Sequence, residues 1–451
     1  MSGSLLDMAK SIVERAAGNE QVEAFLTHAR TFQVRVFEEQ AESVSSAEPR
    51  GAGVRVVKDN KVGFAYTTDL TEPGLTEVVE RARSNARYAT ADVAVALAPA
   101  WTEEPAAIQG LYDPRFEDVD AAQRVAFAID LDRATRSADK RVRTVEDAVF
   151  ADSVSEIALV TTTGIASSFR SSDAWCYSTA IATEGEDTQV GFEFDLARSL
   201  VGLDAEATGK RSADRACSVL GAEKIPTARM PVIFDPYTAG QFLGVLASAL
   251  TGEAVQKGRS LFAGKLGEMV ASESLTLWDD GRIDGAPGSS PWDAEGVPTR
   301  RTEIITAGSL ASFLYDLTSA RREGRASTGN ATRAGFKSAP GPAPSNLAFD
   351  HTGVDRDELL RCAGRALLVQ DLHGVHSGAN PISGDFSVGA TGRLVENGEL
   401  GAPVKEVTIA APMLEILAGI TAVADDRRWL PFGGSLGGAT TLISEMTVAG
   451  T

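Results

Sequence analysis

Histidine is the first residue type in this chain whose spacing suggests chemistry. The chain has four histidines, at His28, His351, His373 and His376. The last two stand three residues apart and could bind one metal ion, with Cys362 or Asp371 near them in sequence. A catalytic zinc site, however, takes three protein ligands and keeps a fourth position open for water, and no H-E-x-x-H pattern occurs. The sequence leaves a metal site at this pair open but favours ordinary hydrogen-bonding roles.

A serine nucleophile is the second chemistry to weigh. Ser377, Ser383 and Ser387 lie close in sequence to His376 and Asp385, and a Ser-His-Asp triad is defined by geometry rather than by chain order. No G-x-S-x-G elbow accompanies these serines, and no P-loop or dinucleotide-binding glycine pattern follows a predicted strand. The sequence therefore gives an independent hydrolase only weak support.

Residues 374–410 combine a polar loop with a predicted hairpin. The loop is made of small polar residues and glycines, and glycines permit positive φ and the close approach of another chain. Strands are predicted at 393–395 and 404–409, around Asn397-Gly398, a pair that suits a type I′ turn. Such a surface can hold an extended peptide, although an ordinary turn-rich loop has the same composition.

Two adjacent arginines, Arg300 and Arg301, follow a loop at 279–298 that is rich in Gly, Pro and Asp. A loop of this length in a compact domain is often functional. The arginines could hold a carboxylate in bidentate fashion, or they could form structural ion pairs in an acidic protein. Both interpretations stay open at this point.

The elements that position these residues begin with an amphipathic N-terminal helix, followed by strands at 32–37, 53–57 and 62–66. A helix starts near Thr71, a good N-cap, and residues 90–118 form a connecting segment. The next helix begins at Asp118 or Asp120. After it come short predicted strands at 142–150, 156–162, 165–172, 174–183 and 189–194, and then a segment at 198–220 that ends as a helix.

A domain boundary is predicted at residues 224–227. Beyond it, 231–234 is a buried strand and 239–250 a nearly all-apolar helix. We therefore expect an α+β protein with an N-terminal α+β domain at 1–223, possibly subdivided near 95–118, and a β-rich C-terminal domain at 224–451. A second long loop is expected at 324–346.

Composition narrows the class of protein. A net charge of −19 argues against nucleic acid as a partner, because phosphate binding needs clustered Lys and Arg. No apolar run approaches the roughly 20 residues of a membrane-spanning helix. Three scattered cysteines (Cys176, Cys217 and Cys362) and the absence of a secretory signal predict a cytoplasmic protein with free thiols.

Three blocks of sequence resemble the TldD/PmbA family, also called the modulator of DNA gyrase family. The N-terminal block is Arg50-Gly51-x-Gly53-Val54-Arg55-Val56, with Gly63-Phe64-Ala65 after it. The middle block is Asp293-x-Glu295-Gly296-Val297-Pro298-Thr299-Arg300-Arg301, with Tyr315-Asp316-Leu317 and Ser327-Thr328-Gly329-Asn330-Ala331. The C-terminal block is Asn380-Pro381-x-Ser383-Gly384-Asp385-Phe386-Ser387-x-Gly389. The resemblance covers nearly the whole chain and is greatest to the PmbA branch, also called TldE.

This resemblance implies a fold of the TldD/PmbA type and a role in a zinc metallopeptidase built from two related subunits. In the TldD branch a zinc motif stands on a helix early in the C-terminal domain, whereas the comparable helix here, residues 241–250, has no metal ligand. The resemblance thus implies a metal-free, non-catalytic subunit that shapes a chamber for unfolded or leader-type peptides, with zinc on a TldD-like partner. The residues expected to line that chamber are Asn380, Ser383, Asp385, Ser387, Arg300 and Tyr315.

Two other classes of function remain open. The chain could be an independent hydrolase that uses the histidine pair or a serine. It could instead be a regulatory or scaffold protein, as the gyrase-related name of the family suggests. Peptidase activity of the isolated chain favours the first, and stable binding to a partner without peptide turnover favours the second.

Overall fold

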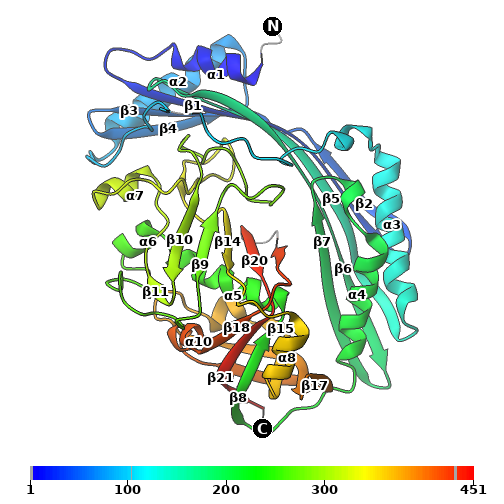
Figure 1. Ribbon diagram of the computed structural model, residues 1–451. Helices are drawn as coiled ribbons and strands as arrows, with labels where there is room; N and C mark the ends of the chain where they lie inside the picture. The colour runs from blue at the N-terminus through cyan, green and yellow to red at the C-terminus, as the bar shows by residue number, and fades with distance from the viewer. Residues whose placement is uncertain (1–3, 103, 431–433, 451) are drawn as a thin grey trace.

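The computed structural model describes residues 4–102, 104–430 and 434–450. It is a mixed α+β structure in which a long, curved sheet wraps one side of a β-rich body (Figure 1). The N-terminal strands form the sheet, and the C-terminal strands form the body. The α+β class expected from the sequence is confirmed.

The N-terminal sheet is antiparallel, with the strand order β4-β3-β1-β5-β6-β7 and with β2 paired to β1. Its strands are β1 (Gln21–Phe37), β2 (Gln40–Ala47), β3 (Arg50–Lys58), β4 (Lys61–Thr67), β5 (Val142–Thr161), β6 (Ala166–Glu184) and β7 (Asp187–Ala197). One sheet thus joins segments on both sides of the connecting residues 90–118.

Two of these strands are longer than the sequence pattern predicts. The expected breaks near 151–155 and at 173 do not exist, and β5 and β6 each run without interruption. Ser153 pairs with Asp173 across the two strands and donates a hydrogen bond to its carboxylate (3.3 Å), while Asp152 accepts from Arg124 (2.6 Å). These polar residues form hydrogen bonds within the sheet and with its covering helix instead of forming turns.

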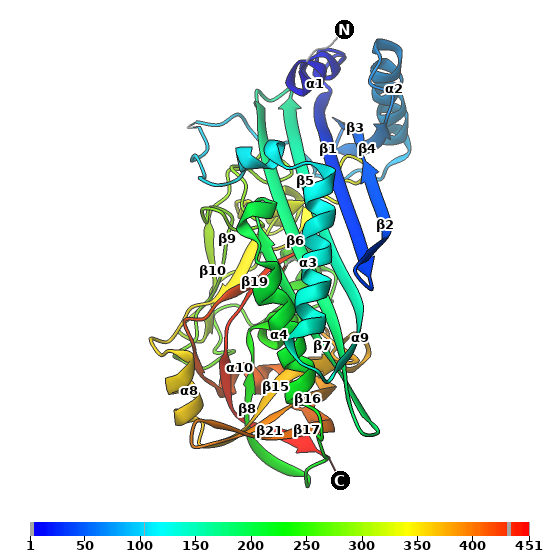
Figure 2. The same ribbon diagram turned by 90° about the vertical axis from the view of Figure 1, so that its right-hand side faces the viewer.

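Four helices belong to this half of the molecule. Helices α1 (Leu5–Val13) and α2 (Glu72–Tyr88) pack at one end of the sheet, and α3 (Ala121–Ala138) and α4 (Ala205–Ser218) lie side by side over its outer face (Figure 2). The predicted starts are confirmed: the Thr71 side chain caps α2, and Asp120 forms a capping box with Gln123 at the start of α3. Short 3₁₀ turns occur at Pro114–Asp118 and Leu200–Gly202.

The C-terminal body contains two six-stranded sheets and a two-stranded ribbon in the part of the chain that the structure describes. The first sheet has the order β11-β10-β9-β14-β20-β19, with β9 (Leu277–Asp280), β10 (Arg301–Thr306), β11 (Ser309–Leu310), β14 (Asn346–Phe349), β19 (Arg428–Leu430) and β20 (Ser435–Gly438). The second has the order β17-β16-β15-β8-β21-β18, with β8 (Ala228–Phe234), β15 (Arg365–His373), β16 (Ser387–Glu396), β17 (Glu399–Ala410), β18 (Ile420–Val423) and β21 (Thr441–Ala449). The ribbon pairs β12 (Ala331–Thr332) with β13 (Gly341–Pro342).

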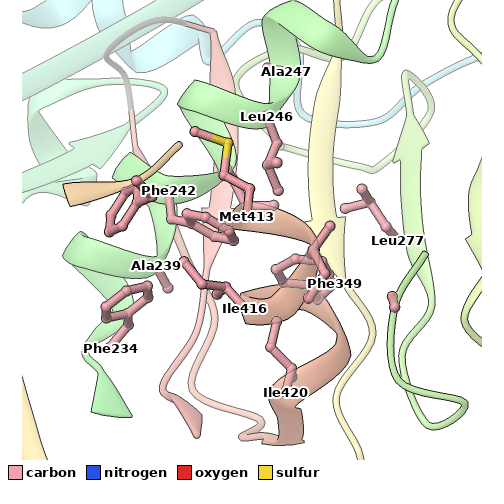
Figure 3. Packing of buried hydrophobic residues seen from close by; sticks show 14 of the residues in the cluster. Phe234, Ala239, Phe242, Leu246, Ala247, Leu277, Phe349, Met413, Ile416 and Ile420 are labelled. Atoms are coloured by element: carbon pink, nitrogen blue, oxygen red, sulfur yellow. The ribbon is translucent and has the colours of Figure 1, made fainter. Parts of the chain in front are cut away.

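Helix α5 (Pro236–Ala249) contacts strands of both sheets. Its apolar face packs on α10 (Met413–Gly419) and on strands of both sheets, where Phe242 and Leu246 meet Met413 and Ile416 (Figure 3). This is the main core of the protein, and Phe194 of the N-terminal sheet belongs to it. The remaining helices are α6 (Gly252–Gln256), α7 (Leu317–Arg322), α8 (Arg356–Cys362) and α9 (Val375–Gly378).

The hairpin predicted around Asn397-Gly398 is confirmed. Strands β16 and β17 pair on either side of it, and both turn residues have positive φ, 54° and 90°. These values fit the type I′ turn that this dipeptide favours. Across the described residues, no helix is long and apolar enough to cross a membrane.

Candidate functional site

Two of the sequence blocks meet at the junction of the N-terminal sheet and the C-terminal body. Arg55 on β3 donates to Glu23 on β1 (2.9 Å) and to Glu295 in the C-terminal body (2.9 Å), and Arg333 also donates to Glu23. All four side chains are buried. Burial raises the pKa of Glu23, but Arg333 and Arg55 together hold it below its ordinary value.

Glycines in the N-terminal block allow this junction to close. A Cβ at Gly51 would lie 2.3 Å from the ring of Phe336, and one at Gly53 would lie 2.4 Å from the Phe336 carbonyl oxygen. Any larger side chain would push the C-terminal loop away. These contacts of the two blocks therefore fix how the N-terminal sheet sits on the C-terminal body.

A candidate site is the groove beside α5. The helix begins at Asp235, which caps it by accepting from Thr238 N (2.8 Å), followed by Pro236 at the first position, where the missing N–H costs nothing. Opposite its buried face, the helix lines a groove of about 620 Å³. The principal lining residues are Gln241, Val245, Ser248, Leu372, Val375, His376, Ala379, Pro381, Leu430 and Leu436.

Two glycines of α5 explain the shape of this groove. A Cβ at Gly240 would lie 2.6 Å from the Leu430 side chain, and one at Gly244 would lie 3.1 Å from Leu436. The missing side chains let β19 and β20 approach the helix, and their leucines form an apolar wall. The opposite wall comes from α9 and the start of the loop after it. The site is thus mainly apolar, with few polar groups.

The groove does not fit a catalytic zinc ion. The face of α5 that lines it presents Gln241, Val245 and Ser248, none of which is a usual zinc ligand. Among residues 4–102, 104–430 and 434–450, no group of three or more His, Cys, Asp and Glu side chains is placed to hold a metal.

The histidine pair does not supply the zinc ligands that α5 lacks. His376 lines the groove, but His373 lines a neighbouring pocket, and its Nε2 lies 3.1 Å from Thr391 Oγ1. Cys362 precedes β15 while His373 ends it, so the length of a nine-residue strand, about 26 Å, separates them. Cys362 therefore cannot complete a site with His373.

The loop after α9 folds into a compact turn at one side of the groove. Asn380 N donates to Asp385 O (2.9 Å), Gly384 N donates to Asn380 O (2.8 Å), and Ser383 Oγ donates to Asp385 Oδ2 (2.6 Å). The four residues that we expected to line a chamber, Asn380, Ser383, Asp385 and Ser387, are all exposed. Their neighbours Ala379 and Pro381 line the groove itself.

The structure corrects the expectation for Tyr315. Its side chain is 1% exposed in the main core, and its hydroxyl donates to Glu323 (2.7 Å). Burial raises the pKa of this phenol above its ordinary value. Tyr315 is therefore a core residue and does not line the groove.

Arg300 is exposed, stands just before β10 and does not line the groove. Its neighbour Arg301 lies over the Trp278 ring and pairs with Asp350 (3.3 Å). For Arg301, the structural ion pair is the interpretation that the geometry supports.

A second, smaller pocket lies next to the groove, and sequence reasoning missed it. It has a volume of about 160 Å³ and is lined by residues 188–192 of β7, by Arg215 of α4, and by Gln370, Asp371, His373 and Thr391. Tyr237 lines both the pocket and the groove. The chain segments that meet here are far apart in sequence, so no local sequence pattern could have predicted the pocket.

Comparison with known proteins supports one family along the chain. Three of its domain models match: the PmbA/TldA metallopeptidase domain 1 at residues 22–86, the central domain at 114–220, and the C-terminal domain at 227–450. Metalloprotease PmbA of Escherichia coli O157:H7 is 28% identical over 91% of this chain and 88% of its own. The metalloprotease TldD homolog of Haemophilus influenzae is 27% identical over 89% and 87%.

Solved structures agree. A putative modulator of DNA gyrase from Thermotoga maritima superposes with a TM-score of 0.90 at 27% identity, covering 98% of this chain and 99% of that one. TldE from Thermococcus kodakarensis has the same fold, with a TM-score of 0.84 at 23% identity over 99% of both chains. On the matched domains, the relatives and the fold, this chain belongs to the PmbA/TldD metallopeptidase family.

Proposed function

We propose that this chain is the metal-free subunit of a heteromeric metallopeptidase, in which a TldD-like partner supplies the zinc and this chain helps to hold the peptide. One observation carries the proposal: the helix that lines the groove, α5, offers neither metal ligands nor an acid or base for hydrolysis. A protein of a metallopeptidase family that keeps such a groove is suited to binding peptide rather than to cleaving it alone.

The groove suits an extended peptide. Its volume of about 620 Å³ lies within the range of ligand pockets, and its apolar wall of Leu430 and Leu436 can cover apolar side chains. The exposed turn at Asn380–Asp385 offers polar groups at the rim. Hydrogen bonds from these polar groups to the main chain of a bound peptide would give affinity without strict sequence preference, which is what unfolded or leader-type peptides require.

We also propose that the protein is cytoplasmic. Cys176 and Cys217 are buried free thiols, and Cys362 is an exposed one. An exposed free cysteine suits a reducing compartment.

The test is reconstitution. The full-length chain is purified alone and together with the TldD-type relative from the same organism, and zinc content and turnover of an unstructured peptide are measured for each. We expect stable association, which for such interfaces buries at least about 1,200 Å², and zinc-dependent turnover only in the complex. Turnover by this chain alone would establish an independent hydrolase, and association without any turnover would establish a scaffold.

A further inference from the structure

We propose that the small pocket next to the groove, lined by β7, α4 and β15, binds a positively charged amine of the peptide. The amine is either the amino end of the peptide or the end of a lysine side chain, which share the same chemistry. This inference rests on the proposed function and adds to it a preference in substrate class. Tyr237 lines both spaces, so a peptide in the groove can reach the pocket.

The pocket holds a carboxylate whose charge is not neutralised. Asp371 lines it with a side chain that is 46% exposed, and in the described part of the chain no lysine or arginine forms an ion pair with it. The nitrogen recorded within ion-pair distance of its carboxylate is Nδ1 of His373, and at 3.8 Å from Oδ2 it is too far away for a hydrogen bond. A ligand that brings one positive charge would therefore complete a pair at this position.

The arginine in the pocket attracts Asp371 electrostatically, but its hydrogen bonds go to other groups. Arg215 donates to Asp235 (2.7 Å) and to the Gln370 carbonyl oxygen, and its side chain is only 17% exposed. Its charge is matched by Asp235, at the N-terminus of α5. An anionic ligand such as a peptide carboxylate would meet Asp371 while Arg215 is already occupied, so the pocket disfavours it.

The hydrogen-bond acceptors in the pocket also favour a ligand that donates hydrogen bonds. An ammonium group carries three N–H donors and no acceptor. Asp371 and Thr391 line the same pocket, and the carboxylate and the hydroxyl can each accept one of these hydrogen bonds.

The size of the pocket limits the ligand. A volume of about 160 Å³ corresponds to roughly five water molecules at about 30 Å³ each, which admits the end of a chain but not a folded segment. Part of its wall is formed by residues 188–192 of β7, the last strand of its sheet.

The experiment compares three synthetic peptides with one neutral, extended sequence and a fluorophore at the carboxyl end. One has a free amino end, one is N-acetylated, and one is N-acetylated with a single lysine near the amino end. Binding is measured by anisotropy for the full-length chain, alone and in complex with the TldD-type relative. We expect the free-amine peptide to bind about tenfold more tightly than the acetylated one, as for a charge-assisted hydrogen bond. The lysine peptide tells whether a side chain can replace the amino end.

The variant D371N removes the charge and keeps the shape. It should abolish the preference for the charged peptides and leave binding of the acetylated peptide unchanged. The matched control is D357N, on an exposed aspartate in the first turn of α8, which should keep the preference.

Three results would overturn the inference. Equal binding of charged and acetylated peptides by the unaltered protein removes the amine site and leaves the proposed function standing. A preference that survives D371N places the amine elsewhere. Failure of every peptide to bind either the chain or the complex overturns the proposed function together with the site.

Discussion

Arg55 and Glu295 form a buried ion pair across the domain junction, with Nη1 of Arg55 2.9 Å from Oε1 of Glu295 and 240 positions between them in sequence. The pair joins a strand of the N-terminal sheet to the loop before β10. Glu295 also accepts from Leu317 N (2.8 Å), so the same carboxylate orders the start of α7. Residues of two of the family blocks here form contacts that hold the N-terminal sheet against the C-terminal body.

The first prediction concerns the stability of this junction. R55M leaves Glu295 without its cationic partner and Glu23 with Arg333 alone, and breaking a buried charge network costs about 3–5 kcal/mol. The free energy of unfolding, measured by urea titration, should fall by about this amount. R50M, in the same sequence block but exposed, is the matched control and should change it by less than about 0.5 kcal/mol. A similar, small effect of both variants would show that the network is dispensable.

The second prediction concerns pH. Burial raises the pKa of Glu23, yet Arg333 and Arg55 outweigh it, so the folded-state pKa lies below the ordinary value of 4.5. A carboxylate with a depressed pKa stabilises the fold above its unfolded-state pKa and loses that contribution as pH falls through its folded-state pKa. The difference in unfolding free energy between the unaltered chain and E23Q should therefore be full at pH 7 and shrink below about pH 4.5.

The control for this titration is E48Q, because Glu48 is exposed and pairs only with His28 in the described structure. Its stability curve should follow that of the unaltered chain at every pH. A difference for E23Q that stays constant down to pH 3 would mean that its effect is steric and not electrostatic.

Local signals in the sequence proved sufficient for turns and helix starts. Thr71, Asp120 and the Asn397-Gly398 turn act through neighbours within four residues, and the structure has each where the pattern indicates. The predicted breaks in β5 and β6 were wrong for the opposite reason. Ser153 and Asp173 are residue types typical of turns, but here they bond to each other across two long strands.

The site itself was beyond local reasoning. The family resemblance suggested Tyr315 as a residue of the chamber wall. Its hydrogen bond to Glu323 and its burial in the core depend on tertiary contacts that the sequence does not show. The groove is made where α5 meets residues 372–381, Leu430 and Leu436. The sequence alone could show that the helix at 241–250 contains no metal ligand, because this depends only on the residue types of one continuous segment.

The third prediction is that this chain purified alone holds no stoichiometric zinc, because α5 offers no ligand and His373 and His376 line different spaces. Elemental analysis of the unaltered chain should match that of H373A and H376A. One tightly bound zinc ion per chain that is lost in either variant would contradict the metal-free role.

The fourth prediction separates a functional from a structural role for the Asn380–Asp385 turn. D385A removes the acceptor of the Ser383 hydroxyl (2.6 Å) and should cost about 1 kcal/mol of stability, as for a lost cap. If the turn contacts peptide, turnover by the reconstituted complex falls while zinc content and assembly stay unchanged, and this is the result we expect. Full turnover below the melting temperature would remove the turn from the site.

The fifth prediction tests the groove. Ser248 is exposed on the groove face of α5, and its hydroxyl donates only to Val245 O, one turn back (3.0 Å). S248W fills the groove without disturbing the buried face of the helix, so the melting temperature should stay within a few degrees of that of the unaltered chain. Peptide turnover by the complex should fall at least about tenfold, because an indole occupies space that the peptide needs.

The matched control for this variant is S137W. Ser137 is also an exposed helical serine whose hydroxyl donates to a carbonyl three residues back, that of Ala134 (3.4 Å), but it stands at the end of α3, the helix that covers the outer face of the N-terminal sheet. The two variants add the same side chain to the same local setting and differ in the surface that receives it. Equal turnover by both complexes would show that the groove beside α5 does not receive peptide. A loss confined to S248W, with zinc content and assembly intact, would assign peptide binding to a helix that has no catalytic group.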